Sequence, residues 1–257
     1  MDDPSRATLD AMAPDLAEVP LPFIRDHITE NATDMLLGLR TLLPTLPSTI
    51  DRRSVPLSFT VPVPPNPQSP GLEPNYPTHV LAVSLPTSTA EEPLTLIAIH
   101  GIVLAAHCAA STLRAPPVAA GSNLETLVLP VWPVVLPSID AFLTLRTFMY
   151  THHVETLLGE LLPLIGELLP LPVSLTGENV HATLASEVEI ELLVTHLVRE
   201  NPGIQHLEQW GTRIEEFDDT VRWLQMDDSE LRATIALAWE LVRRVELRIC
   251  GLAPDTA

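Results

Sequence analysis

The chain has 257 residues, of which 33 are acidic and 14 basic, so its formal net charge at pH 7 is −19. A surface this acidic repels phosphate backbones, which disfavours direct nucleic-acid binding. Every basic residue is an arginine, and this excludes Schiff-base lysine chemistry and the lysine of a P-loop.

Cysteine content and hydropathy bear on the compartment. The two cysteines, Cys108 and Cys250, are too few for a disulfide framework. The first residues are acidic and lack the basic and apolar parts of a secretory leader. The longest apolar run, from Leu157 to Val173, is interrupted by glutamate and proline and is a poor membrane span. We therefore expect a protein of the nucleus and/or cytoplasm that does not bind membranes.

The N-terminal third predicts helices followed by an extended arm. Residues 1–52 are expected to be helical, with one helix from Ile24 to Leu43 that ends before Pro44. Residues 53–77 are expected to be an extended, proline-rich arm or linker. Within 54–65 the apolar residues occupy one parity and the prolines occupy the other, a pattern that allows only an edge strand or an extended arm.

Residues 78–172 predict a small α/β core. Val80–Leu85 and Leu94–Ile99 flank a turn-like stretch and predict a β-hairpin. A short helix over 102–110, a third strand over 124–129 and a helix over 139–151 follow, the last of them capped by Ser138. We expect the three strands to share one sheet that these two helices cover.

Residues 173–257 predict an acidic helical region. Ser186 and Glu189 have capping-box spacing. Two apolar stripes follow, over 207–224 and 231–249, and Gly251 ends the second. They predict an antiparallel helical hairpin whose apolar faces pack on each other. If the first stripe were instead exposed, a candidate partner surface would comprise Trp210, Phe217, Asp218 and Asp219.

Five histidine and cysteine side chains in the middle of the chain are candidate catalytic or metal-binding groups: His100, His107, Cys108, His152 and His153. Their spacing matches no zinc motif, and no nucleophile-elbow or dinucleotide-binding glycine motif is present. A hydrolase that uses Cys108 with His107 or His100 as base remains the enzymatic alternative. We expect no catalytic residue, cofactor or metal, and therefore not an enzyme.

The segment from Val80 to about Leu164 resembles the BTB/POZ fold. In that family a hairpin leads into a histidine and a helix with the pattern H-K-x-V-L-A-A, and a later helix ends in Y-T. The matching residues here are His100, Gly101, Val103, Leu104, Ala105, Ala106, Phe142 and Tyr150. The family's lysine is replaced by Gly101. The resemblance implies an α+β fold with a BTB/POZ-like core, in which these residues serve structure or interaction.

A resemblance that covers more of the chain is to the clampless-type developmental regulators of basidiomycete fungi. It rests on the run Thr78–Pro86, on Leu94 to Cys108, on the proline-interrupted leucine run after Tyr150 and on the acidic helical tail. The resemblance implies a nuclear, non-catalytic regulator of sexual development that acts in clamp-cell formation and dikaryon proliferation through transcription-factor partners. The alternative is a BTB-type substrate adaptor of a cullin ubiquitin ligase. Homo-oligomers fit either function.

Overall fold

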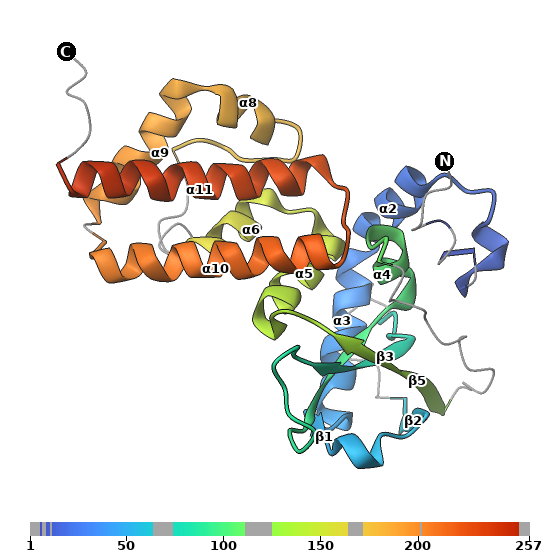
Figure 1. Cartoon of the computed structure of the whole chain (residues 1–257). Coiled ribbons are helices and arrows are strands. Elements are labelled where there is room, and N and C mark those ends of the chain that lie inside the picture. Colours follow the sequence, from blue (N-terminus) through green and yellow to red (C-terminus); the bar gives the residue numbers. More distant parts are fainter. Residues whose placement is uncertain are drawn as a thin grey trace. The chain divides into compact units, whose positions relative to one another are not determined.

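The computed structural model describes residues 6, 9, 10, 12–63, 74–110, 125–163, 172–200 and 202–251. The described chain is α+β, as predicted, and its contacts divide it into two compact units (Figure 1). Unit 1 comprises residues 1–139, 149–151 and 222–227, and unit 2 comprises 140–148, 152–221 and 228–257. No described helix combines the length and the hydropathy that a membrane span requires.

Two helices, α2 (Leu21–Glu30) and α3 (Ala32–Leu42), occupy the region for which the sequence predicts a single helix from Ile24. The single helix is wrong at Asn31, whose backbone leaves the helical range (φ −99°, ψ 8°). The Asn31 side-chain amide donates to the carbonyl oxygen of His27 at 2.8 Å, and such local bonds compete with helix continuation. Short 3₁₀ helices also lie in this region: η1 (Pro14–Leu16), η2 (Leu43–Thr45) and η3 (Arg52–Ser54).

The sheet of unit 1 has five strands in the order β1-β4-β3-β5-β2. Strands β3 (His79–Ser84) and β4 (Leu94–Ile99) pair antiparallel, which confirms the predicted hairpin. Strand β5 (Thr126–Val135) lies parallel to β3, so the three predicted strands share one sheet. The remaining strands, β1 (Thr49–Ile50) and β2 (Ser58–Pro62), pair with β4 and β5.

Both edges of this sheet are protected against the addition of further strands. Strand β1 has only two residues. At β2, the carbonyl oxygen of Leu57 accepts the N–H of Val131, so odd-numbered residues face β5 and even-numbered residues face the open edge. Pro56 and Pro62 have the outward parity and offer no N–H to an incoming strand. Of the two alternatives for this segment, an edge strand or an extended arm, the structure shows an edge strand whose prolines lie on the outer side.

Strand β5 continues to Val135, and the predicted end at Leu129 is wrong. The strand extends beyond Leu129 because β5 pairs with β2 over its first half and with β3 over its second half. The N–H of Val131 points to the β2 side and that of Leu136 to the β3 side. By alternation, the nitrogen of Pro130 faces the β3 side, where pairing with β3 has not yet begun. The nitrogen of Pro133 faces the β2 side, where pairing with β2 has ended.

The helices after the hairpin differ from prediction in length and packing. Helix α4 (Gly101–His107) ends before the predicted Ala110 and packs on α2. Helix α5 (Ile139–Thr151) has the predicted bounds, but its residues 140–148 belong by their contacts to unit 2. His152, with a positive φ of 49°, separates α5 from α6 (Val154–Leu161). The expected cover of the sheet by 139–151 is therefore not the main packing of that helix.

Unit 2 contains the helices predicted for the acidic C-terminal region: α8 (Val180–Ala185), α9 (Glu187–Arg199), α10 (Ile204–Trp223) and α11 (Ser229–Ile249). The hydroxyl of Ser186 accepts the N–H of Glu189 at 3.3 Å, as the capping box predicts. Asp228 caps α11 by accepting the N–H of Leu231 at 2.9 Å. Gly251 has a φ of 68°, the left-handed conformation expected after a helix end.

The burial predicted for the two apolar faces of the helical hairpin is confirmed, and α11 has further helix neighbours besides α10. Trp210 and Phe217 of α10 and Ile235 and Val242 of α11 are all buried, so both apolar faces are internal. The closest packing of α11, however, is with α6, α8 and α9 rather than with α10. The prediction paired α10 with α11 alone, whereas α6, α8 and α9 also contribute buried apolar residues to this unit.

Candidate functional site

The histidine of the family motif lies in a buried hydrogen-bond network of unit 1. The Tyr150 hydroxyl oxygen is 2.8 Å from Nδ1 of His100 and accepts the His100 backbone N–H at 3.1 Å. Nε2 of His100 lies 3.1 Å from the carbonyl oxygen of Asn75. Because that carbonyl can only accept, Nε2 carries the proton, and the Tyr150 hydroxyl donates to Nδ1. The network joins the start of α4, the end of α5 and the segment that leads into β3.

Gly101 explains a departure from the BTB/POZ pattern. Its N–H donates to the hydroxyl oxygen of Thr78 at 2.9 Å. A Cβ at this position would lie 2.1 Å from Cε of Met12 and 2.7 Å from Nδ1 of His79. A lysine therefore does not fit here unless its neighbours move. The remaining residues of this motif segment, Val103, Leu104, Ala105 and Ala106, are buried in α4.

The small side chains of α4 allow close packing with α2. Nε of Arg25 in α2 donates to the carbonyl oxygen of Ala106 at 2.8 Å. Phe142, the motif residue in α5, has no exposed surface. These positions serve the interior of the protein rather than an open surface.

The histidine and cysteine side chains considered for catalysis have different surroundings. Cys108 is buried, and burial raises the pKa of its thiol, so the thiol is protonated at neutral pH and is a weak nucleophile. His107 is also buried, and His153 is exposed. Nδ1 of His152 lies 3.9 Å from carboxylate oxygens of Asp228 and Glu230. A buried, protonated Cys108 thiol is poorly suited to act as the nucleophile of a hydrolase.

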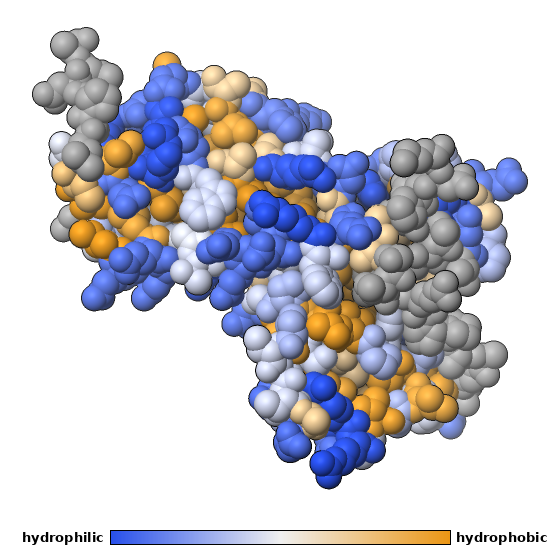
Figure 2. Space-filling model, in the orientation of Figure 1, coloured by the Kyte–Doolittle hydropathy of each residue, from blue (hydrophilic) through white to orange (hydrophobic). Residues whose placement is uncertain are grey.

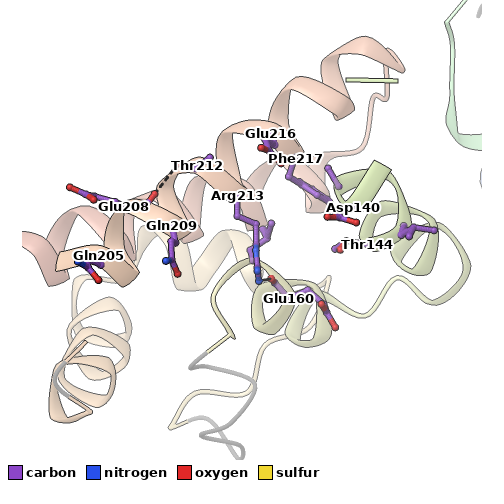
Figure 3. A pocket seen from close by; sticks show the side chains of 13 residues that line it. Asp140, Thr144, Glu160, Gln205, Glu208, Gln209, Thr212, Arg213, Glu216 and Phe217 are labelled. Carbon is purple, nitrogen blue, oxygen red and sulfur yellow. Dashed lines mark hydrogen bonds between the residues drawn. The ribbon is translucent and has the colours of Figure 1, made fainter. Parts of the chain in front are cut away.

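A groove of about 980 Å³ opens in unit 2 (Figure 3). Helix α10 forms one wall, and the start of α5 and the end of α6 form the other. Its apolar lining includes Ala141, Leu161 and Phe217, all buried. Its polar lining is largely exposed and comprises Asp140, Thr144, Glu160, Gln205, Glu208, Gln209, Thr212, Arg213 and Glu216. An apolar base within a polar rim is the usual composition of a protein-binding surface.

Negative charge dominates this groove. Four carboxylate side chains line it, against the single guanidinium of Arg213. Nη1 of Arg213 donates to the carbonyl oxygen of Glu160 at 2.9 Å, which joins α10 to the end of α6. Figure 3 shows Arg213 directed from α10 towards Glu160. Within the described chain, no cation pairs with the carboxylate of Asp140, Glu160 or Glu208.

The four residues of the partner surface predicted from the sequence differ in their exposure. Trp210 and Phe217 are 4% and 1% exposed, so neither ring is available to a partner without rearrangement. Asp218 is half-buried and Asp219 is exposed. The prediction that these four residues contact a partner stays a prediction.

The groove-lining face of α10 is the feature that the sequence reading missed. The polar residues at 205, 208, 209, 212, 213 and 216 follow the spacing of one helix face. This periodicity could have been found in the sequence, but a polar face is ordinarily solvated. Its place in a groove depends on α5 and α6, which lie more than 40 residues away in the chain.

Comparison with known proteins identifies the family. No curated protein and no solved structure matches the chain, so the BTB/POZ-like core stays a prediction. The model of the Clampless protein 1 N-terminal domain matches residues 1–137, more than half of the chain. This range ends two residues before Ile139, where the long first segment of unit 1 ends. The chain therefore belongs to the clampless family of fungal developmental regulators.

Proposed function

We propose that this protein is a non-catalytic regulator of fungal sexual development that acts by binding other proteins. The observation that carries the proposal is the family match over residues 1–137. The specific processes proposed are clamp-cell formation and proliferation of the dikaryon, with transcription factors as partners. The proposed compartment is the nucleus and/or cytoplasm, and homo-oligomers are compatible with this function.

Two features support binding rather than catalysis. The thiol considered as a nucleophile, Cys108, is buried and protonated at neutral pH. The groove of unit 2 combines an apolar base with an exposed polar rim, which suits contact with another protein. The net charge of −19 supports the further proposal that the protein does not bind nucleic acid directly.

The cullin-adaptor alternative gains no support. Its basis was the BTB/POZ resemblance, and no solved structure matches the chain. The family match points to developmental regulation instead.

Gene replacement in a basidiomycete host tests the proposal. Deletion is expected to abolish clamp cells, and the wild-type gene is expected to restore them. Cys108→Ser and His107→Ala, each expressed as folded protein, are expected to restore them as well. Normal clamp cells in the deletion strain would contradict the developmental function. Loss of clamp cells with folded Cys108→Ser would contradict the non-catalytic function.

A further inference from the structure

We infer that the groove of unit 2 binds an arginine-bearing peptide segment of a partner protein. The inference rests on the proposed function, because it assumes that the protein acts by binding proteins, and it adds the chemistry of the partner. It concerns Asp140, Glu160, Glu208 and Glu216 on the rim and the apolar base between α5, α6 and α10.

Geometry favours a peptide segment over a small ligand. The polar face of α10 lines the groove from Gln205 to Glu216, three helical turns, or about 16 Å at the rise of an α-helix. A segment of about five extended residues spans that length. Because Thr212, Glu208 and Gln209 are exposed, the groove is open along α10, as a chain that enters and leaves requires.

Charge selects the partner. The carboxylates of Asp140, Glu160 and Glu208 have no cationic partner among the described residues, as noted above. The Arg213 guanidinium, the groove's own cation, already donates to the Glu160 carbonyl oxygen at 2.9 Å. Arginine fits such carboxylates better than lysine, since its planar guanidinium can donate to both oxygens of one carboxylate.

The apolar residues of the groove restrict which side chains the bound peptide can carry. Leu161 and Phe217 are almost fully buried, and Leu143 is half-buried. Because Leu161 and Phe217 are covered, the accessible apolar surface beside the carboxylates comes from Leu143 and is a narrow strip rather than a deep pocket. The aliphatic part of an arginine side chain can lie on such a strip while its guanidinium reaches the rim. A segment with arginines and few large apolar residues therefore matches the lining.

Peptide binding to the full-length protein tests the inference. The probe is a fluorescein-labelled peptide with spaced arginines, and a peptide with glutamine at the same positions is its control. Fluorescence anisotropy is expected to show binding of the arginine peptide alone, weakening as salt increases. Glu160→Gln/Glu208→Gln is expected to weaken binding about fivefold, since each exposed ion pair contributes about 0.5 kcal/mol.

A matched variant separates the groove from the overall negative charge. Glu200→Gln/Glu215→Gln removes two exposed carboxylates of unit 2 that do not line the groove, and it is expected to leave the affinity unchanged. Equal weakening by both variants, or no binding of the arginine peptide, would overturn the inference. If the protein nevertheless retains proteins from mating-cell extract, and the groove variant retains the same ones, the inference fails while the proposed function survives. If the wild-type protein retains none, the proposed function fails as well.

Discussion

The two units bury polar groups in opposite ways. In unit 1, His79, His100 and Tyr150 lie inside, and His100 is bonded to groups 25 and 50 residues away along the chain. In unit 2, the buried Thr220 and Thr234 hydroxyls donate to carbonyl oxygens of their own helix, at 2.8 and 2.7 Å. Long-range internal hydrogen bonds thus help to determine the fold of unit 1, whereas buried apolar helix faces determine the fold of unit 2.

Ion pairs at the surface of unit 2 join neighbouring helices. In unit 2, Arg244 donates to Glu187 and Glu191 of α9 and to Glu240 of its own helix, and Arg248 donates to Glu191 and Thr195. These ion pairs join α9 to α11 at the surface. The carboxylates in the groove take no part in them. Arg244 and Arg248 therefore join α9 to α11, whereas the groove remains predominantly acidic. Figure 2 shows hydrophilic and hydrophobic residues interspersed over the visible face of unit 2.

The largest loss of folding stability is expected from Phe217→Ala in unit 2. The ring is 1% exposed, and removal of a buried aromatic side chain destabilises a protein by about 3–5 kcal/mol. Ile204→Ala in the same helix is the control, because Ile204 is 58% exposed and its removal should cost little. Thermal melting measures both. An unchanged melting temperature with weaker partner binding would mean that the ring works in an exposed groove.

A glycine-to-alanine pair contrasts the two units directly. A Cβ at Gly38 in α3 would lie 1.7 Å from the backbone oxygen of Asn75, so Gly38→Ala should destabilise unit 1 by about 3 kcal/mol. At Gly211 in α10 the nearest group is the Trp239 ring, at 3.8 Å. Gly211→Ala should therefore stabilise the helix by about 0.5–1 kcal/mol. Chemical denaturation of the two variants measures both signs, and equal effects would contradict the packing described here.

Tyr150→Phe tests the buried network of unit 1. It leaves Nδ1 and the backbone N–H of His100 without the bonds at 2.8 and 3.1 Å. We expect a loss of about 1–3 kcal/mol in the free energy of unfolding. The double variant His100→Leu/Tyr150→Phe should cost less than the sum of the single variants, because the coupled pair is lost together. Strict additivity would show that the two side chains do not interact.

Acid should weaken the surface ion pairs of unit 2. Hydrogen bonds from Arg243 and Arg244 lower the pKa of Glu240 from 4.5 to about 2. A carboxyl whose pKa is depressed by folding stabilises the folded state above its unfolded pKa. That stabilisation is lost as the pH falls through about 4.5 towards 2. Glu240→Gln should lower the melting temperature slightly at pH 7 and flatten the acid dependence. Parallel acid profiles for the variant and the wild-type protein would contradict the role of Glu240.

The sequence was informative where structure is local. Helix stripes, the Ser186 cap and the Gly251 helix end depend on neighbouring residues and were predicted correctly. The end of β5 was missed because Pro130 is tolerated only by the exchange of strand partners. The groove was also missed because it depends on contacts between distant segments: the polar face of α10 lines a groove only where α5 and α6 form the opposite wall. The phenol that completes the bonds of His100 lies 50 residues away and could not be assigned from the motif.

Clamp-cell formation in strains that carry the groove variants tests the central claim most directly. The account predicts that Glu160→Gln/Glu208→Gln, expressed at the wild-type level and with an unchanged melting temperature, fails to restore clamp cells in the deletion strain. Glu200→Gln/Glu215→Gln should restore them, because its carboxylates lie outside the groove. Normal clamp cells with the groove variant would contradict the claim that this protein acts through the acidic groove of its helical unit.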